Sequence, residues 1–266
     1  MKVVLSIAGS DSSGGAGIQA DIKTIAAHGL FAETAVTALT AQNTMGVAGV
    51  LEATPEFVAS QIDAVFEDIR PDAVKVGMVS SAAIIRAIAE RLRAWGARNV
   101  VVDPVMVATS GSRLIDEDAV AALSDELLPL ARVVTPNMPE AAVLADRPVV
   151  DDASMLEAAR IVSCGLAEAG GDAAVLVKGG HGTATADDLL FEAGGGVHWL
   201  RAERIPTRNT HGTGCTLSSA IACGLAEGKD LLQAVSDAKE YVRGALSAGL
   251  DLGRGSGPLD HMWRYR

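Results

Sequence analysis

The sequence predicts an α/β fold, a three-layer α/β/α sandwich around a mostly parallel central sheet, and three observations support this prediction. Short apolar runs alternate with segments in which apolar residues recur every three or four positions, as strands and helices do. Repeated strand–helix units are typical of parallel strands that are joined by covering helices. Aromatic residues make up only 3% of the chain, so the core must consist of aliphatic side chains, which suits packed layers.

The first half of the chain contains four predicted strands, and each leads into a polar loop or a helical pattern. Helices are expected from Ile18, Thr54 and Ser81, because Thr and Ser favour the position just before a helix. Gly29 and Gly96 come just after two of these patterns, where glycine ends a helix. The strands are expected at residues 3–8, 34–40, 73–77 and 100–102.

The second half continues the same pattern. Asp116 is a candidate cap for a helix, and Ser154 with Glu157 is interpreted as a capping box. The tail after Gly253 is expected to be frayed or edge structure. Because no linker, repeat or low-complexity tract appears, residues 1–266 are interpreted as one domain. Strands are expected at 132–134 and 174–177, a hairpin over 188–200, and helices at 120–127, 154–169, 215–226 and 231–249.

Composition excludes several classes of function. The formal net charge of −11 argues against broad binding of nucleic acid or of an anionic membrane surface. Apolar runs stay shorter than a membrane-spanning helix requires. Cys164, Cys215 and Cys223 show neither metal-type nor disulfide-type spacing, which favours a reducing, cytoplasmic location.

Unusual polar clusters follow the predicted strands. Because the carboxyl ends of parallel strands meet at one edge of a sheet, these clusters are expected to form a single ligand site there. The glycine-rich loop at 9–17 lacks the Gly-Lys-Ser/Thr ending of a nucleotide P-loop and the spacing of a dinucleotide fingerprint. The clusters lie at 9–17, 40–46, 103–111, 135–140, 178–182 and 209–215.

The stretch 209–217 is the strongest candidate for phosphate binding. A glycine loop runs directly into an apolar helical pattern, so the unpaired N–H groups of the helix start lie within the loop. Cys215 lies at this helix start, where a thiolate is stabilised. The alternative is an ordinary loop-to-helix join with a small buried cysteine.

Candidate metal and phosphate ligands follow the later strands. Asp103 ends a strand and suits Mg²⁺, which prefers oxygen ligands and keeps much of its water. Asn137 and Glu140 lie three residues apart at a helix start and could complete the shell, although Glu140 could instead stabilise the helix dipole. Lys178 ends a buried strand and could reach phosphates, or it could simply extend its charge to solvent.

Candidate acceptor ligands are polar residues near the first two strand ends. Asp21 and Gln42 could face a small polar ligand, although a first-turn dipole role and a turn role, respectively, remain open. Met78 follows a strand and is a credible pocket wall. His181 and His211 are treated as structural, because no carboxylate partner is visible near them in the sequence.

With these residues assembled, the chain resembles the ribokinase superfamily, and within it the hydroxymethylpyrimidine/phosphomethylpyrimidine kinases of thiamine biosynthesis. The resemblance implies a ribokinase-like fold, ATP and Mg²⁺ as cofactors, and phosphorylation of the hydroxymethyl pyrimidine and then of its monophosphate. A homodimer is implied by the family alone. The matching segments occur in order over nearly the whole chain, at 8–21, 38–44, 75–78, 102–106, 135–140, 177–181 and 209–216.

The resemblance also implies roles for individual residues. The metal would be organised by Asp103 and Glu140. Residues near the nucleotide would be Asn137, Lys178 and Lys239, with Lys178 stabilising the transferred phosphate. The backbone N–H groups of an anion hole would come from Gly212, Thr213, Gly214 and Cys215. Contacts to the aminopyrimidine would come from Gly9, Asp21, Gln42, Met78 and Val105.

Cys215 stands where the resembling sugar kinases usually carry an aspartate as general base. One hypothesis is that Cys215, with a pKa lowered by the helix end, accepts the hydroxymethyl proton. The alternative is that it contributes only its backbone N–H. Pyridoxal kinase is the nearest alternative enzyme, and a non-catalytic pyrimidine or nucleotide sensor is the alternative from another class. Residues 106–113 are expected to form a flap.

Overall fold

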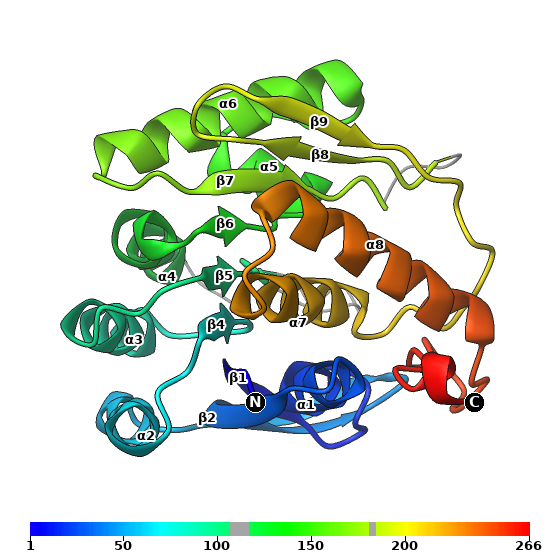
Figure 1. The fold of residues 1–266 in the computed structure, drawn as a ribbon, viewed down its shortest axis with the longest axis horizontal. Coiled ribbons are helices and arrows are strands. Elements are labelled where there is room, and N and C mark those ends of the chain that lie inside the picture. Colours follow the sequence, from blue (N-terminus) through cyan, green and yellow to red (C-terminus); the bar gives the residue numbers. More distant parts are fainter. Residues whose placement is uncertain (107–116, 181–184) are drawn as a thin grey trace.

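Residues 1–106, 117–180 and 185–266 are described by the structure, a computed structural model of the chain (Figure 1). The strands in this part form one nine-stranded sheet with the order β3-β2-β1-β4-β5-β6-β7-β8-β9. The six neighbouring strands β2, β1, β4, β5, β6 and β7 pair in parallel. Strand β3 pairs antiparallel with β2, β8 with β7, and β9 with β8. The strands are β1 (Val3–Asp11), β2 (Phe31–Asn43), β3 (Gly46–Glu52), β4 (Ala73–Val76), β5 (Val100–Val102), β6 (Val133–Val134), β7 (Ala174–Val177), β8 (Asp188–Phe191) and β9 (Val197–Leu200).

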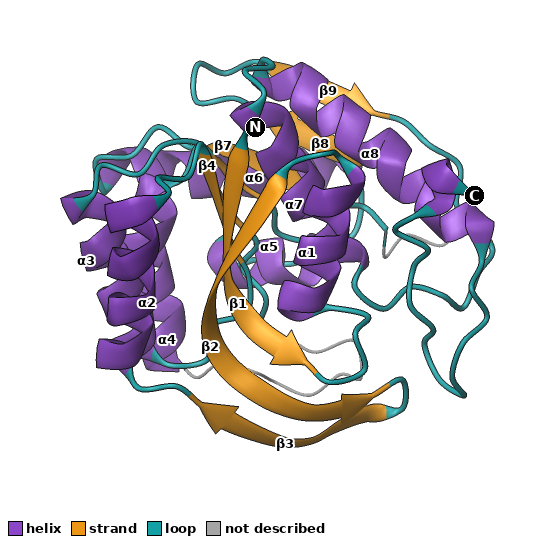
Figure 2. Cartoon of the chain, turned by 60° about the horizontal axis from the view of Figure 1, so that its bottom comes forward, coloured by secondary structure: helices purple, strands orange, loops and turns teal. Residues whose placement is uncertain are grey.

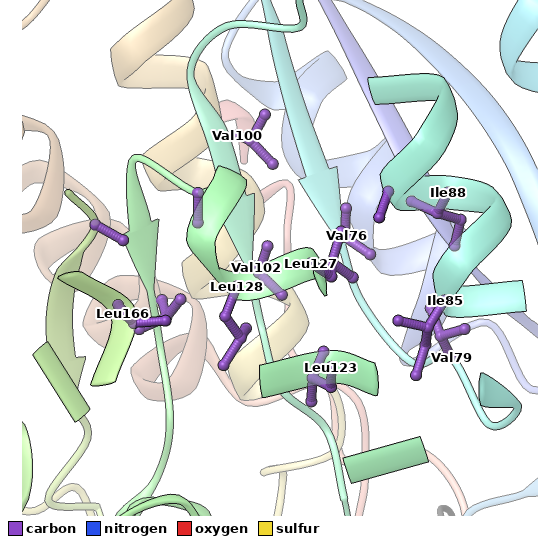
Figure 3. Packing of buried hydrophobic residues seen from close by; sticks show 14 of the residues in the cluster. Val76, Val79, Ile85, Ile88, Val100, Val102, Leu123, Leu127, Leu128 and Leu166 are labelled. Carbon is purple, nitrogen blue, oxygen red and sulfur yellow. The ribbon is translucent and has the colours of Figure 1, made fainter. Parts of the chain in front are cut away.

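Helices cover both faces of this sheet, which confirms the predicted α/β/α sandwich. Strand β5 illustrates why: Val100 and Val102 pack against the layer that contains α2, α3 and α6, whereas Val101 faces the layer of α1, α7 and α8. Figure 3 shows the first of these cores, with Val76 and Val102 pointing toward Ile88 and Leu127. The helices are α1 (Gly17–Ala27), α2 (Pro55–Asp68), α3 (Ala82–Ala94), α4 (Glu117–Ala122), α5 (Met138–Leu144), α6 (Asp152–Glu168), α7 (Thr213–Ala226) and α8 (Leu231–Ala248).

The predicted helix starts at Thr54 and Ser81 are confirmed, whereas the helices predicted to start at 154 and 215 begin two residues earlier, at Asp152 and Thr213. Thr54 and Ser81 cap α2 and α3 by accepting hydrogen bonds from backbone N–H groups. The capping box of α6, however, pairs Asp151 with Ser154, so the predicted pairing of Ser154 with Glu157 is wrong. A serine three residues after an aspartate can serve as the reciprocal acceptor, which moves the helix start back. Asp116 lies outside the described residues.

The segment after the second predicted strand is a strand and not a loop. Strand β2 extends to Asn43, and β3 returns antiparallel to it. In Figure 2 the end of β2 and the whole of β3 curve below the helical layers. The end of β2 together with β3 is here called the β2–β3 arm. Leu39, Val50 and Leu51 are exposed on it. Strand β3 contains two glycines, and most of its apolar side chains are exposed, so its sequence lacks the alternation of buried and exposed residues that predicts a strand.

The tail after Gly253 is packed into the fold, so the prediction of a frayed end is wrong. Leu259 is buried in the core on the side of the sheet covered by α1, α7 and α8. His261 is also buried, and its carbonyl oxygen accepts a hydrogen bond from the Tyr241 hydroxyl (2.6 Å). None of the described helices is long and apolar enough to cross a lipid bilayer.

Glu33 on β2 makes stability depend on pH. Its Oε2 atom is buried without a hydrogen-bond partner in the described part of the chain, and burial with nearby Asp68 raises the pKa of Glu33 to about 7. The folded state then binds more protons than the unfolded state between the two pKa values, so stability falls as pH rises through that window. Because Glu33 is partly exposed, Glu33→Gln is expected to stabilise the fold by only about 1 kcal/mol at pH 8 and not at pH 4.

Denaturant unfolding at the two pH values measures this effect. Glu67→Gln, on the exposed surface of α2, is the matched control. It should change the free energy of unfolding by the same small amount at both pH values. Equal effects of Glu33→Gln at pH 4 and pH 8 would contradict the account.

Candidate active site

The carboxyl ends of β5, β6 and β7 bring a lysine and an aspartate into contact. Lys178 Nζ lies 2.7 Å from Asp103 Oδ1, and the Thr135 hydroxyl donates to the same oxygen (2.9 Å). Asp103 is only 2% exposed. A carboxylate held by a lysine and a hydroxyl keeps its second oxygen directed toward the start of α7, since a Cβ on Gly214 would lie 3.1 Å from Asp103 Oδ2.

Asn137 and Glu140 form a capping box at the start of α5. The Asn137 N–H donates to Glu140 Oε2 (2.7 Å), and the Glu140 N–H donates to Asn137 Oδ1 (2.9 Å). Burial and the Asp103 carboxylate raise the pKa of Glu140 to about 7, although Lys178 opposes the rise. Glu140 therefore caps a helix and also places a second buried carboxylate near Asp103.

This donor set fits a divalent cation that also binds other ligands. Asp103 and Glu140 supply hard oxygen atoms, and the pKa of Glu140 is raised first by burial and then by the Asp103 carboxylate, with Lys178 opposing the rise. In the described ranges no group of three or more His, Cys, Asp or Glu side chains is arranged to hold a metal. Two carboxylates suffice for Mg²⁺, which commonly keeps water and binds phosphate oxygens.

The start of α7 lies next to this pair, and one of its predicted anion-hole donors is already used, because the Thr213 N–H donates to the Thr210 carbonyl oxygen (3.3 Å). Gly212 is the N-cap, with φ of 87°, and a Cβ there would lie 1.9 Å from the Gly15 carbonyl oxygen. Only glycine fits a left-handed conformation and so close an approach. A Cβ on Gly214 would lie 3.3 Å from Lys178 Nζ. The helix start and the Lys178 ammonium thus face the same space, which favours an anion there.

Cys215 is partly exposed, and its thiol lies between the starts of two helices. The backbone N–H of Gly17, the first residue of α1, lies near the Cys215 sulfur. Burial raises the pKa of the Cys215 thiol, and the nearby Lys75 ammonium only partly opposes this. The expectation that the helix end lowers this pKa is therefore wrong, because loss of hydration outweighs the helix dipole and the lysine.

Asp21 lies behind Cys215 and not on an open surface. Its carboxylate accepts hydrogen bonds from Lys75 (2.8 and 3.0 Å), Ser6 (2.5 Å) and Ser219 (2.7 Å). Asp21 and Lys75 are fully buried. The predicted contact between Asp21 and a substrate is not supported, since both of its oxygens are occupied. Lys75 had no assigned role, although a lysine inside an apolar strand signals a buried partner.

Gln42 and Met78 lie at the edge near the ends of β1 and β2. A Cβ on Gly9 would lie 2.7 Å from Met78 Cε, so Gly9 makes room for this side chain. Gln42 Nε2 lies 3.3 Å from His211 Nε2, which lies 2.8 Å from Asp11 Oδ2. His211 thus has the carboxylate partner that the sequence did not reveal, since the two residues are separated by 200 positions.

Asp11 organises the loop beneath this edge. Its carboxylate accepts hydrogen bonds from the N–H groups of Ser13 (2.8 Å), Gly15 (3.0 Å) and Ala16 (2.9 Å). Burial raises the pKa of Asp11, but the hydrogen bonds from His211 and Ser13 outweigh burial, so the net pKa lies well below its usual range. Asp11 is therefore a permanent anion that fixes the loop against Gly212.

Val105 and Lys239, the remaining predicted site residues, lie in different surroundings. Val105 is partly exposed just after Asp103. Lys239 Nζ binds Asp188 Oδ2 (2.6 Å) and the Ala186 carbonyl oxygen (2.6 Å), and Asp188 Oδ1 accepts from the Gly179 N–H (2.9 Å). Lys239 therefore supports the loop after Lys178, and its predicted contact with the nucleotide is not supported. His181 and most of the predicted flap at 106–113 lie outside the described residues.

Comparison with known proteins gives this arrangement a family. A protein-family model described as phosphomethylpyrimidine kinase matches residues 11–260. The chain belongs to the phosphomethylpyrimidine kinase family. The hydroxymethylpyrimidine/phosphomethylpyrimidine kinase of Rhizobium meliloti (strain 1021) is 54% identical over 267 residues, which cover 99% of this chain and 98% of that relative.

Solved structures place the family within the predicted ribokinase-like fold. The phosphomethylpyrimidine kinase from Clostridium difficile 630 is 41% identical, with a TM-score of 0.80, over 91% of this chain and 98% of that one. A pyridoxal kinase from Bacillus subtilis, in an ADP complex, is 33% identical, with a TM-score of 0.90, over 100% of this chain and 99% of that one. The phosphomethylpyrimidine kinase fold is thus shared with pyridoxal kinases.

Proposed function

We propose that this chain transfers the γ-phosphoryl group of ATP to 4-amino-5-hydroxymethyl-2-methylpyrimidine, and then a second one to the monophosphate, in thiamine biosynthesis. The observation that carries the proposal is the convergence of the Lys178 ammonium and the α7 amides beside the Cys215 thiol. A cation, preorganised N–H donors and a proton acceptor are what phosphoryl transfer to a hydroxyl group requires. The names of relatives, which are kinases of this pyrimidine, supply the substrate.

The nucleotide and the metal are assigned to the edge formed by β5, β6 and β7. Asn137 and Lys178 would face the phosphates of ATP, and Asp103 and Glu140 would hold Mg²⁺. When bound, Mg²⁺ neutralises charge on phosphate oxygens. The ADP complex of the Bacillus subtilis relative supports the use of a nucleotide. Residues 1–266 would act as one domain, and the free state of all three cysteines supports a cytoplasmic location.

Glu140→Gln is expected to raise the Mg²⁺ concentration for half-maximal activity about 10- to 100-fold. The variant removes a charged ligand but keeps an oxygen that can accept the Asn137 N–H, so α5 remains capped. A magnesium titration of initial rates measures the effect. Ser154→Ala, which weakens the α6 capping box away from this edge, is the control for a lost cap. An unchanged magnesium requirement in Glu140→Gln would remove Glu140 from the metal site.

The acceptor would bind between Gly9, Gln42, Met78 and Val105, with its hydroxymethyl group toward Cys215. Gln42 offers one donor and one acceptor, which suit the amino group and ring nitrogen of an aminopyrimidine. Asp21 supports this wall from behind through Ser219 and Lys75. Cys215 has two alternative roles here: its thiol could accept the hydroxymethyl proton, or it could contribute only its backbone N–H to the anion hole.

Pyridoxal phosphorylation is the second candidate function, favoured by the TM-score of 0.90 to the Bacillus subtilis pyridoxal kinase. A coupled assay of ADP release, with the hydroxymethyl pyrimidine, its monophosphate and pyridoxal as competing acceptors, separates the two. The proposal expects the highest kcat/KM with the pyrimidine. A preference for pyridoxal would overturn it, and binding of a pyrimidine without ADP release would identify a sensor.

We also propose a homodimer that uses the arm formed by β2 and β3. Leu39, Leu51 and Phe57 are 54%, 68% and 63% exposed, and Val50 lies on the edge strand β3. An exposed strand edge with apolar side chains is a common pairing surface. Sedimentation equilibrium tests this, and a monomer at all accessible concentrations would overturn it.

A further inference from the structure

Residues 253–258, here called the C-terminal strap, lie against the tip of the β2–β3 hairpin. The N–H groups of Arg254 and Gly255 each lie 3.2 Å from Thr44 Oγ1, and the Ser256 N–H donates to the Thr44 carbonyl oxygen (3.1 Å). Thr44 comes two residues after Gln42. The strap therefore holds the end of β2, the strand that carries Gln42, which is proposed to bind the acceptor substrate.

The same strap also binds the loop that enters α7. The Gly257 N–H donates to the Arg208 carbonyl oxygen (3.2 Å), and the His211 N–H donates to the Gly257 carbonyl oxygen (3.0 Å). His211 is the residue whose ring contacts Gln42. Both partners of the Gln42–His211 contact are thus fixed by one segment that is more than 200 residues away from Gln42 in the sequence.

The rest of the tail anchors the strap to the fold. Leu259 is 1% exposed, and His261 Nε2 lies 3.0 Å from Thr216 Oγ1 in the first turns of α7. In Figure 1 the red C-terminal segment lies beside α1 and the end of α8. The residues that follow the strap are therefore joined to α7 by packing and by a side-chain contact.

Two strap glycines are required by close packing and not by backbone conformation. A Cβ on Gly255 would lie 2.0 Å from the Thr44 carbonyl oxygen, and a Cβ on Gly257 would lie 2.1 Å from Asn209 Oδ1. Neither residue is among those with positive φ. An alanine at either position would therefore push the strap away from its partner without straining its own backbone.

We propose that the C-terminal strap is a positioning element for the acceptor, because it clamps the β2–β3 tip to the loop that enters α7 and so sets Gln42 against His211. This inference rests on the proposed function for the identity of the acceptor. The strap touches no catalytic atom. It determines how well the acceptor wall is formed, and it leaves Asp103, Glu140 and Lys178 on the nucleotide side in place.

The test measures KM for the hydroxymethyl pyrimidine and KM for ATP in Gly255→Ala and Thr44→Val. Thr44→Val removes the oxygen that accepts the two strap N–H groups and keeps the side-chain shape. It therefore replaces Gly255→Ala in the test if that variant does not fold. Loss of these hydrogen bonds is expected to raise the pyrimidine KM about five-fold or more. The KM for ATP should change less than about two-fold, which a general loss of folding would not produce.

Gly194→Ala is the matched control, because a Cβ there meets no atom within 4 Å and its φ is not positive. An unchanged pyrimidine KM in folded strap variants, or an equal rise in both KM values, would overturn the proposal. Turnover of the native chain with the pyrimidine tests the proposed function separately. If the native chain prefers pyridoxal, the same comparison is made with the pyridoxal KM.

Discussion

Lys178→Met is expected to lower kcat for phosphoryl transfer about 100- to 1000-fold. The ammonium of Lys178 lies beside Asp103 and faces the N-terminal amides of α7, where the proposed function puts the transferred group. Burial opposes its charge, but the carboxylates of Asp103 and Glu140 outweigh burial and raise the pKa of Lys178. The side chain is therefore a fixed cation that stabilises charge developing in the transition state.

Steady-state kinetics with the pyrimidine and ATP measure this loss. Lys2→Met is the control, because it removes the lysine of another ion pair, with Asp72, at the opposite edge of the sheet. Circular dichroism of both variants checks that the fold is retained. A folded Lys178→Met enzyme that keeps more than about a tenth of native kcat would contradict the assigned role.

Cys215→Ala is expected to lower the rate of the first phosphoryl transfer about 100-fold and the rate of the second much less. A hydroxymethyl group must lose a proton as it attacks, whereas the monophosphate acceptor is already ionised and needs no strong base. Single-turnover rates with each acceptor measure the two steps. Equal losses in both steps would contradict the base role, and near-native turnover in both would leave Cys215 only its backbone N–H.

The pH dependence of the first step provides a second readout of the same residue. Because burial raises the pKa of the Cys215 thiol, the base form is scarce at neutral pH. The native rate of the first transfer should therefore rise between about pH 7 and 9, and Cys215→Ala should lack this rise. Cys215→Ser keeps the side-chain shape and separates packing from acid–base chemistry.

Much of the fold follows from local patterns in the sequence. Short apolar runs such as Val100–Val102 are typical of interior parallel strands, and in the structure these residues are buried on both faces of the sheet. Their carboxyl ends must then meet, so the proximity of Asp103 and Lys178 could be predicted although they are 75 residues apart. The start of α7 was recognisable because Gly212 and Gly214 lie where a polar loop runs into an apolar helical pattern.

The features that were missed depend on pairing between distant segments. Asp21 looked like a first-turn residue, and only the buried Lys75 on β4 turns it into a core ion pair. His211 looked unpartnered because Asp11 lies at the other end of the chain. The glycines at 253, 255 and 257 resemble a flexible tail, whereas each one makes room for Thr44 or Asn209. Composition alone cannot distinguish a glycine that packs from one that is free.

The stoichiometry of ADP release tests the central claim, that one site phosphorylates the pyrimidine twice. A limiting amount of 4-amino-5-hydroxymethyl-2-methylpyrimidine is incubated with the native chain and excess ATP, and ADP and phosphorylated products are counted by mass spectrometry. We expect two ADP molecules per pyrimidine and complete conversion to the diphosphate. Release of a single ADP per pyrimidine, with the monophosphate as the final product, would contradict it.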